Sequence, residues 1–511
     1  MSGAPGQRVA GDALRQLGTT ALGMGGGVVL SILLARALGP REMGSYALAL
    51  MVVTAVQTVA GLGLERTALK FTAELTAGPA ARAMRWLLIR RSLLAVGATL
   101  ALGAAAPLLG SLFHDPLLAP LLLIGTGLLL PGMVEEVLES GLEGASRFDL
   151  LARATLWLTP IHLLATGGAL ALGGGVANVM VAQAGATLAS VGILAGLSRR
   201  AGILAWRPGP VPAPLAKRMG RFAGHAYWLS LLSFVVRDRI EVLLLGALST
   251  SEDIGFYSVA LGAAEAAMRL GPWIVATVFY PLLVADCARA GWAGAAPRYA
   301  QCLRYLSFTA APLALGGIAV AEAGVAVVFG PAYAPMVPLL RISLLSAGAA
   351  AVAQGPTGMI AAAERQEWLL RVRTPLAVAN VLLNLALIPR FGALGAASAN
   401  LAVAVSEALL LSLLAGRLGR TAPPLSLLAP LLAATLAAAV AGLALGGRTD
   451  AVALVRSVLL AVPVYFGALA AGRFFRPEDA VLARPVLQLV ARVAKGTPTP
   501  APSPTRHDTL S

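Results

Sequence analysis

The chain has 511 residues, of which 58% are apolar and only 12% are charged, and its formal net charge is +15. A soluble domain carries about a quarter charged residues, so this composition excludes a soluble globular protein and predicts one whose surface largely faces lipid. Aromatic residues make up 5% of the chain, whereas 56 residues are Gly. Small residues suit packed transmembrane helices better than the alternating strands of a barrel.

Apolar runs of about 20 residues, long enough to cross a hydrocarbon core of ~30 Å, mark the expected spans. The first run follows Arg8 and Arg15 and is too long for the apolar region of a signal peptide, so we interpret it as an uncleaved span. The shortest run, 375–389, is expected to begin a few residues earlier. The fourteen predicted spans cover residues 16–36, 45–64, 87–112, 117–138, 151–172, 176–197, 222–247, 255–284, 305–328, 336–360, 375–389, 394–415, 425–446 and 452–472.

Basic residues are distributed unevenly between the two sides that this map defines. With the N-terminus inside, the external loops hold only Arg36, Arg41, Arg390 and Arg448, and most of the 39 Lys and Arg residues fall on the cytoplasmic side. The positive-inside rule therefore predicts that both termini lie in the cytoplasm, and we expect a multi-pass protein of the cell inner (plasma) membrane. The basic residues determine topology and contact anionic lipid headgroups, so no nucleic-acid partner is predicted.

Two similar stretches join neighbouring spans at corresponding places. Residues 34–50 join the first and second spans, and residues 248–261 join the seventh and eighth. We name them the first and second elbow and expect both on the external side. Such echoes are typical of internally repeated transporters. The matched pairs are Glu42 and Asp253, Met43 and Ile254, Gly44 and Gly255, and Tyr46 and Tyr257.

The repeat predicts an all-α integral membrane protein with about 14 transmembrane helices, arranged as two parallel six-helix lobes around a central cavity, plus two extra helices. We expect the N-terminal lobe at 1–197, a cytoplasmic linker at 198–221, the C-terminal lobe at 222–415, the two additional helices at 416–472 and a cytoplasmic tail at 473–511. Alternating prolines in the linker predict a stiff, extended connector.

The tail carries one amphipathic segment before a disordered end. Arg484, Gln488, Arg492 and Lys495 fall on one helical face. We expect either a helix lying in the membrane interface or a short helix packed on the protein. The Pro-, Thr- and Ser-rich residues 496–511 predict disorder.

Six charged residues lie inside the seventh and eighth predicted spans. Because a charge at the centre of the bilayer costs at least ~2.5–3.5 kcal/mol, these side chains are expected to face a water-filled cavity or one another. Each span contains an acid and an arginine four residues apart, on one helix face. The six residues are Arg237, Asp238, Arg239 and Glu241 in the seventh span and Glu265 and Arg269 in the eighth.

These charges admit two interpretations. In the first, they are self-neutralised pairs that hold the two spans together. In the second, the arginines line the cavity and bind an anionic headgroup, since a guanidinium donates bidentate hydrogen bonds to phosphate and stays protonated. Arg237 and Arg269 are the first choices for this role, followed by Arg239. The neighbouring acids, which would balance charge or carry a coupling H⁺ or Na⁺, are Asp238, Glu241 and Glu265.

Arg66 and Lys70 follow the second span and admit two interpretations of their own. They are either cytoplasmic topology charges or groups that capture a headgroup at the mouth of the cavity. The sequence contains no catalytic, nucleotide-binding or metal-binding motif, so we predict a protein that is not an enzyme and needs no cofactor or metal. Cys287 and Cys302 are predicted to be free thiols.

Four short stretches follow one another in the order of a known family. They are ARALGP with GSY at 35–46, DR, LG and GFY at 238–257, FGPAYA with LLR at 329–341, and NL with IPRFGALGAA at 384–397. The chain thereby resembles the polysaccharide flippases, the O-antigen and exopolysaccharide translocases of the multidrug/oligosaccharidyl-lipid/polysaccharide exporter superfamily. That family usually has twelve spans. Fourteen is the number in lipid II flippases, where the extra pair forms a groove for the lipid tail.

The resemblance implies a function in cell-surface polysaccharide biosynthesis. It implies that a polyprenyl-diphosphate-linked oligosaccharide moves from the cytoplasmic to the outer leaflet by alternating access, with membrane lipids around the protein and a polysaccharide polymerase or glycosyltransferases as possible partners. The alternatives are a multidrug or toxin extrusion antiporter, a lipid II flippase and a non-transporting membrane scaffold. An extruder of organic cations is expected to carry cavity acids unopposed by arginine, unlike the seventh and eighth spans.

Overall fold

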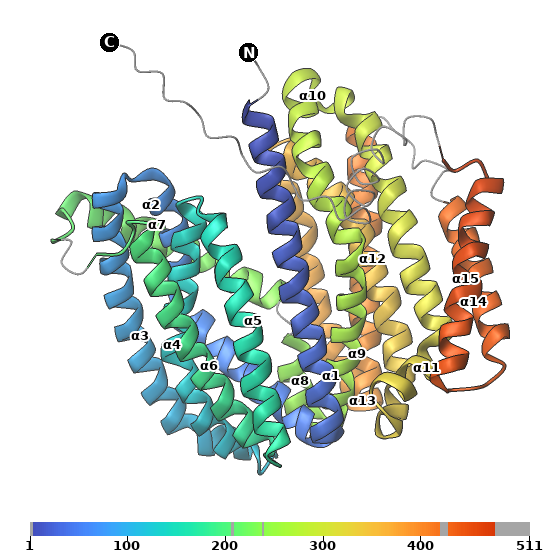
Figure 1. Ribbon diagram of the computed structural model, residues 1–511, viewed down its shortest axis with the longest axis horizontal. Helices are drawn as coiled ribbons and strands as arrows, with labels where there is room; N and C mark the ends of the chain where they lie inside the picture. The colour runs from blue at the N-terminus through green and yellow to red at the C-terminus, as the bar shows by residue number, and fades with distance from the viewer. Residues whose placement is uncertain (1–3, 206–208, 238–239, 420–427, 476–511) are drawn as a thin grey trace, which may run out of the picture.

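The computed structural model describes residues 4–205, 209–237, 240–419 and 428–475, which excludes the predicted tail helix through Arg484 and Lys495. Within the described residues the chain is helical without strands, and the helices run side by side as a bundle (Figure 1), so the predicted all-α membrane fold is confirmed. The elements in chain order are α1 (Ala4–Gly61), α2 (Leu64–Glu74), α3 (Ala77–Leu112), α4 (Leu118–Gly144), α5 (Phe148–Ala171), α6 (Val176–Arg200), α7 (Ala213–Arg237), α8 (Ile240–Leu248), α9 (Ser251–Leu270), α10 (Pro272–Ala311), the π turn η1 (Pro312–Gly316), α11 (Gly317–Val328), the 3₁₀ turn η2 (Pro331–Met336), α12 (Val337–Ala362), α13 (Gln366–Gly419), α14 (Leu428–Leu445) and α15 (Ala451–Ala471).

Three of these helices contain the glycine at which the chain turns from one span to the next. The backbone leaves helical geometry at Gly39 in α1 (φ 73°), at Gly291 in α10 (φ 65°) and at Gly392 in α13 (φ 54°). These φ values lie in the left-handed region, which glycine adopts without the steric penalty of a Cβ atom. Each glycine therefore reverses the chain between two membrane-crossing segments.

Each of the fourteen predicted spans falls mainly on helix in the described residues, with turns at 62–63, at 271 and at a few span ends. Nine helical segments of the described residues are long and apolar enough to cross a membrane, and three of them are the joined pairs above. The eighth span consists of α9 and the first part of α10, which meet at Gly271. The eleventh span begins at Gln366, earlier than its apolar run, as expected.

Two segments differ from the sequence-based expectation. A short helix, α2, follows the second span and buries Leu64 and Phe71 against the neighbouring helices. The connector between α6 and α7 is shorter than the predicted linker, because α7 already begins at Ala213. Pro214 sits in the first turn of α7, where a proline removes no helical hydrogen bond and so permits the helix to start there.

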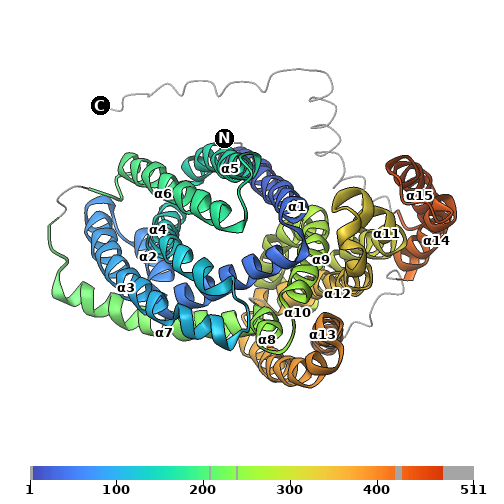
Figure 2. The same cartoon turned by 90° about the horizontal axis from the view of Figure 1, so that it is seen from below.

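The two elbows pack against each other at the end of the bundle opposite the N-terminus, which we name the elbow end (Figures 1 and 2). A Cβ atom added to Gly44 would lie 1.6 Å from the carbonyl oxygen of Ser251, and one added to Gly255 would lie 1.9 Å from that of Pro40. Only glycine permits this approach of two backbones. The residues that the sequence repeat matched therefore meet in space.

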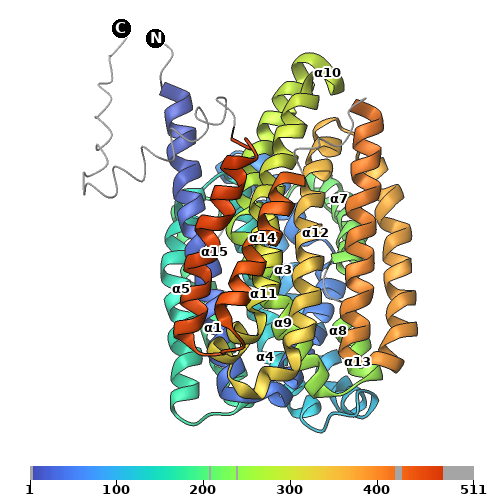
Figure 3. The same cartoon turned by 90° about the vertical axis from the view of Figure 1, so that its right-hand side faces the viewer.

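The last two helices, α14 and α15, form a hairpin that packs beside α11 (Figure 3). Towards the other end of the bundle, the ring of Phe308 on α10 stacks on those of Tyr465 and Phe474, at centroid distances of 5.9 and 5.5 Å. The Tyr465 hydroxyl donates a 2.7 Å hydrogen bond to the Phe308 carbonyl. This aromatic group fixes the hairpin to α10.

We predict that Gly44→Ala destabilises the protein, because its methyl group would overlap the Ser251 carbonyl and force the elbows apart. Overpacking of this kind costs roughly 1–3 kcal/mol. Thermal unfolding of the purified protein in detergent measures the effect. Gly185→Ala on α6 is the matched control, since nothing lies within 4 Å of its added Cβ. Equal melting temperatures for the two variants would contradict the backbone contact.

Candidate functional site

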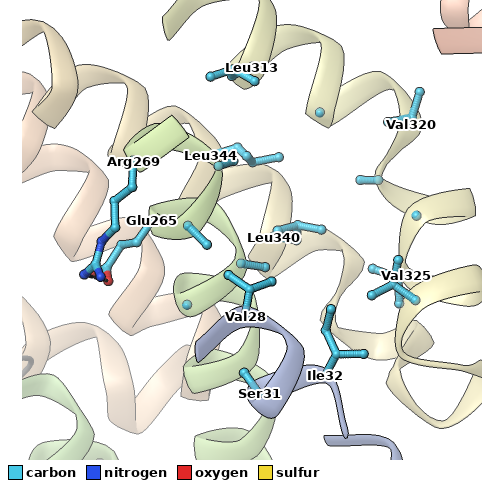
Figure 4. Close-up of a pocket in the computed structure, with 18 of the residues that line it drawn as sticks. Val28, Ser31, Ile32, Glu265, Arg269, Leu313, Val320, Val325, Leu340 and Leu344 are labelled. Atoms are coloured by element: carbon cyan, nitrogen blue, oxygen red, sulfur yellow. Dashed lines mark ion pairs between the residues drawn. The ribbon is translucent and has the colours of Figure 1, made fainter. Parts of the chain in front are cut away.

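A cavity of about 1540 Å³ lies between both halves of α1 and the helices α9, α10, α11 and α12, and extends to α14 and α15. Most of its wall is aliphatic or glycine. Figure 4 shows Val28 and Ile32 of α1 facing Leu340 of α12 and Val325 of α11 across the pocket. The cavity is therefore an apolar space far larger than a single side chain, and helices that are distant in sequence line it.

One ion pair interrupts this apolar wall. The Arg269 guanidinium lies 3.7 Å from the Glu265 carboxylate, one turn earlier on α9, and their side chains are 55% and 33% exposed. Figure 4 shows the two charged ends meeting at one edge of the pocket. Counted from the predicted start of the eighth span at residue 255, Glu265 lies ~15 Å along the helix, near the middle of a hydrocarbon core of ~30 Å.

The other predicted site residues either lie outside the described residues or do not line this cavity. Arg237 ends α7, but its side chain lies outside the described residues, as do Asp238 and Arg239 entirely. Arg66 and Lys70 lie exposed on α2 and are not among the residues that line the cavity. The Lys70 ammonium lies 4.1 Å from the centre of the Phe222 ring of α7, a cation–π contact. Within the described residues, only Arg269 and Glu265 of the predicted set line the cavity.

Glu241 is buried away from the cavity wall. Its carboxylate accepts a 2.9 Å hydrogen bond from the Tyr257 hydroxyl, and that hydroxyl also accepts a 3.4 Å bond from the side-chain amide of Asn400 on α13. In the first half of the chain, the Tyr46 hydroxyl is likewise bonded to the amide of Gln183 on α6. The tyrosines of the two elbows thus occupy equivalent environments, and Glu241 is an addition to the second.

A buried aspartate closes the elbow end. Asp115, in the turn between α3 and α4, accepts hydrogen bonds from Ser45 (2.5 Å) and Ser251 (2.9 Å). Ser45 belongs to the first elbow and Ser251 to the second, so one carboxylate bridges both. Arg36 adds a further link, because its guanidinium donates a 2.8 Å hydrogen bond to the Val327 carbonyl at the end of α11.

A second, polar cavity of about 330 Å³ lies within the first half of the chain. Three acids of α4, Glu135, Glu136 and Glu139, line it together with Gln57 of α1. Beside it, Arg91 on α3 is 1% exposed, and its charged end is a guanidinium group. It contacts the carboxylates of Glu65 and Glu136 and donates a 3.1 Å hydrogen bond to the Met133 carbonyl.

The sequence analysis did not identify this polar group, although charged residues inside two predicted spans indicated it. Glu135 and Glu136 fall inside the predicted span 117–138, and Arg91 falls inside the span 87–112. Because a charge inside the membrane is costly, these residues, like those of the seventh and eighth spans, also required partners within the protein. Among the described residues, no cluster of His, Cys, Asp or Glu is suited to hold a metal ion.

A family model described as "polysaccharide biosynthesis protein" matches residues 33–338. No curated protein matches the chain. Among solved structures, the lipid II flippase MurJ in an inward closed conformation is similar over 93% of this chain and 99% of its own, with a TM-score of 0.73 and 13% identity.

Two structures of a multidrug resistance MATE family transporter are also similar. The inward-facing one gives a TM-score of 0.59 at 13% identity, over 80% of this chain and 99% of the other. The outward-facing one gives 0.52 at 14% identity, over 80% and 96%. These likenesses show that the chain shares the fold of the MurJ and MATE structures.

We predict that Arg91→Leu lowers stability by roughly 3 kcal/mol, because removing the guanidinium leaves Glu65 and Glu136 unpaired in a partly buried site. Thermal unfolding in detergent measures the loss. Adding Glu136→Gln to this variant should recover part of it. The control is Arg90→Leu, since exposed Arg90 stacks on Trp86 at 3.6 Å and that contact contributes about 0.5–1 kcal/mol. A loss no larger than that of the control would show that the guanidinium does not hold the acids.

Proposed function

The chain belongs to the polysaccharide biosynthesis protein family, and on this premise we propose that it is a flippase for a lipid-linked oligosaccharide. Its substrate would be a polyprenyl-diphosphate-linked oligosaccharide, which it moves from the cytoplasmic to the outer leaflet of the inner membrane for cell-surface polysaccharide biosynthesis. The fold is that of multi-pass membrane transporters. The single observation that carries the proposal is the large apolar cavity with one arginine–carboxylate pair in its wall.

The proposed orientation follows from the distribution of basic residues. Both termini lie in the cytoplasm and the elbow end faces outward. The bonds from Ser45 and Ser251 to Asp115 then close the cavity towards the outside, so the lipid enters from the cytoplasmic leaflet. Opening on the other side requires the Ser251 bond to break, since Asp115 and Ser45 both belong to the first half of the chain.

We propose that the chain folds as two six-helix lobes that meet at the elbows. We assign 1–197 and 222–415 to the lobes, 198–221 to their linker and 416–472 to the additional helices. The elbows, which begin the two lobes, form the contact about which the lobes would rock between inward- and outward-open states.

Arg269 is the proposed contact for the diphosphate, and Arg237 is the second candidate. A guanidinium can donate two parallel hydrogen bonds to a phosphate, and it remains charged in an apolar site. Weakly hydrated arginine is also less costly than lysine to hold at mid-membrane depth. Glu265 neutralises Arg269 when no substrate is present.

The part of the cavity next to α14 and α15 is the proposed site for the polyprenyl chain. Its wall there includes Ala437, Ala461 and Val462, with Gly316 of η1 opposite. Small apolar residues leave room for a hydrocarbon chain and offer it no polar group. The coupling ion, H⁺ or Na⁺, and a polymerase or glycosyltransferase partner belong to the same proposal.

A multidrug extruder is the second candidate, because the polar cavity supports it. Within the described residues, Glu135 and Glu139 line that cavity without an ion pair to an arginine, whereas Glu136 pairs with Arg91. Carboxylates in such a cavity attract organic cations or protons. A lipid II flippase is the third, since the similar MurJ structure carries that name. Reconstituted vesicles offered a polyprenyl-diphosphate sugar, lipid II or an organic cation distinguish the three, and movement of the cation alone would reject a flippase.

We predict that Arg269→Ala reduces translocation of a fluorescent polyprenyl-diphosphate sugar in vesicles by at least roughly tenfold, because the phosphates lose their charged contact. Arg269→Lys should retain part of the activity, since lysine keeps the charge but not the bidentate geometry. The matched control is Arg448→Ala, which breaks an exposed arginine–aspartate pair outside the cavity. Unchanged transport by Arg269→Ala would reject this residue as a phosphate contact.

We also predict that Ala461→Trp slows transport of a substrate with a long polyprenyl chain severalfold, because the indole fills the space beside α15. A substrate carrying a farnesyl chain should be affected less. The comparison uses both lipids in the same vesicle assay. Leu443→Trp serves as control, as Leu443 is 83% exposed on α14 and does not line the cavity. Equal slowing of both lipids would argue against a tail site here.

A further inference from the structure

The cavity contains a carboxylate placed to occupy the same arginine that the proposed substrate requires. Glu265 lies one helical turn before Arg269, and both side chains reach the cavity. The pair is fixed by the helix itself, since residues four apart lie on one face. Side-chain rotation alone can bring the two groups together or separate them, without movement of the helix backbone.

The Glu265–Arg269 pair lies in a cavity wall that is otherwise largely apolar. Among the described residues that line the cavity, the other titratable side chains are those of Tyr46 and Tyr465, and both hydroxyls are hydrogen-bonded within the protein. Charged residues of neighbouring helices, such as Glu241 of α8 and Arg341 of α12, do not line the cavity. Among the described residues of this wall, the charged side chains are therefore Glu265 and Arg269, and the attraction between ions is stronger there than in water.

A diphosphate that enters must take the guanidinium from Glu265. A group with two phosphates offers Arg269 more negative charge and more hydrogen-bond acceptor oxygens than one carboxylate does. A monophosphate has less advantage over the carboxylate. When the lipid leaves, Glu265 is one turn away and pairs with Arg269 again, so the empty cavity does not hold an uncompensated charge at mid-membrane depth.

We propose that Glu265 is an internal competitor for Arg269 that makes the cavity selective for diphosphate over monophosphate lipids and promotes release of the transported lipid. This inference rests on the proposed flippase function. Glu265 is a positioning residue, since it acts on the substrate through Arg269. Its loss should therefore increase affinity and decrease turnover, which a merely structural role would not do.

The test compares binding of farnesyl diphosphate and farnesyl monophosphate to the purified full-length protein in nanodiscs. We expect the wild type to bind the diphosphate roughly tenfold more tightly, a difference of about 1.4 kcal/mol. Glu265→Gln keeps the shape but removes the charge. It should tighten binding of both lipids, and that of the monophosphate more, so that the ratio falls severalfold.

Turnover in vesicles provides the second readout. Glu265→Gln should lower both KM and kcat for a polyprenyl-diphosphate sugar, because substrate is held but released slowly. Glu265→Asp should restore part of the selectivity and the turnover. The matched control is Glu252→Gln, at an exposed position in the first turn of the same helix and outside the cavity. Melting temperatures establish that each variant is folded.

The outcomes separate this inference from the function on which it rests. Unchanged affinity, selectivity and turnover in Glu265→Gln, together with loss of binding in Arg269→Ala, would overturn the role of Glu265 and leave the flippase proposal standing. If the wild type bound neither lipid and moved no lipid-linked sugar, the flippase proposal would fail, and the inference with it.

Discussion

The contact between the two elbow backbones constrains the rest of the structure. Gly44 and Gly255 bring the first and second halves of the chain together without intervening side chains. In a membrane, where lipid supplies no hydrophobic drive between helices, such close approach provides the van der Waals contact that holds a bundle together. Asp115 then joins the hydroxyls of Ser45 and Ser251 at the same place. The helices diverge from this point, and the apolar cavity lies between them.

The interior arginines Arg91 and Arg269 are both paired with carboxylates, but in two different arrangements. Arg91 is almost fully buried and contacts the carboxylates of Glu65 on α2 and Glu136 on α4. Among the described residues, Arg269 forms its ion pair with Glu265 of its own helix, and it remains half-exposed in a cavity. Both arrangements avoid an unpaired charge in the membrane. Only the second leaves the arginine accessible, and accessibility distinguishes a candidate site from a structural ion pair.

The spans and the repeat could be predicted from the sequence because each depends on local patterns. Hydrocarbon thickness fixes the length of an apolar run, and the matched residues around Gly44 and Gly255 mark the elbows directly. Arg269 and Glu265 were identified because charge is rare in a span. The polar group around Arg91 was not, since charges near the ends of spans are ordinary topology signals whether or not they turn inward. Nor did the sequence show that Glu241 points to Tyr257: in helices that are apolar on every side, no hydrophobic stripe indicates which face meets protein.

The departure from exact repetition explains where a long lipid would fit. Tyr46 and Tyr257 make equivalent bonds to amides of α6 and α13, so the two halves share a framework. The hairpin of α14 and α15, however, packs against α10, η1 and α11, all of which belong to the second half. It extends the cavity on that side alone. In the proposed binding mode, a headgroup at Arg269 and a hydrocarbon chain running towards α15 would share this one cavity, since Arg269 and residues of α15 both line it. The extra pair thus changes the shape of the cavity without disturbing the elbow contact that both halves require.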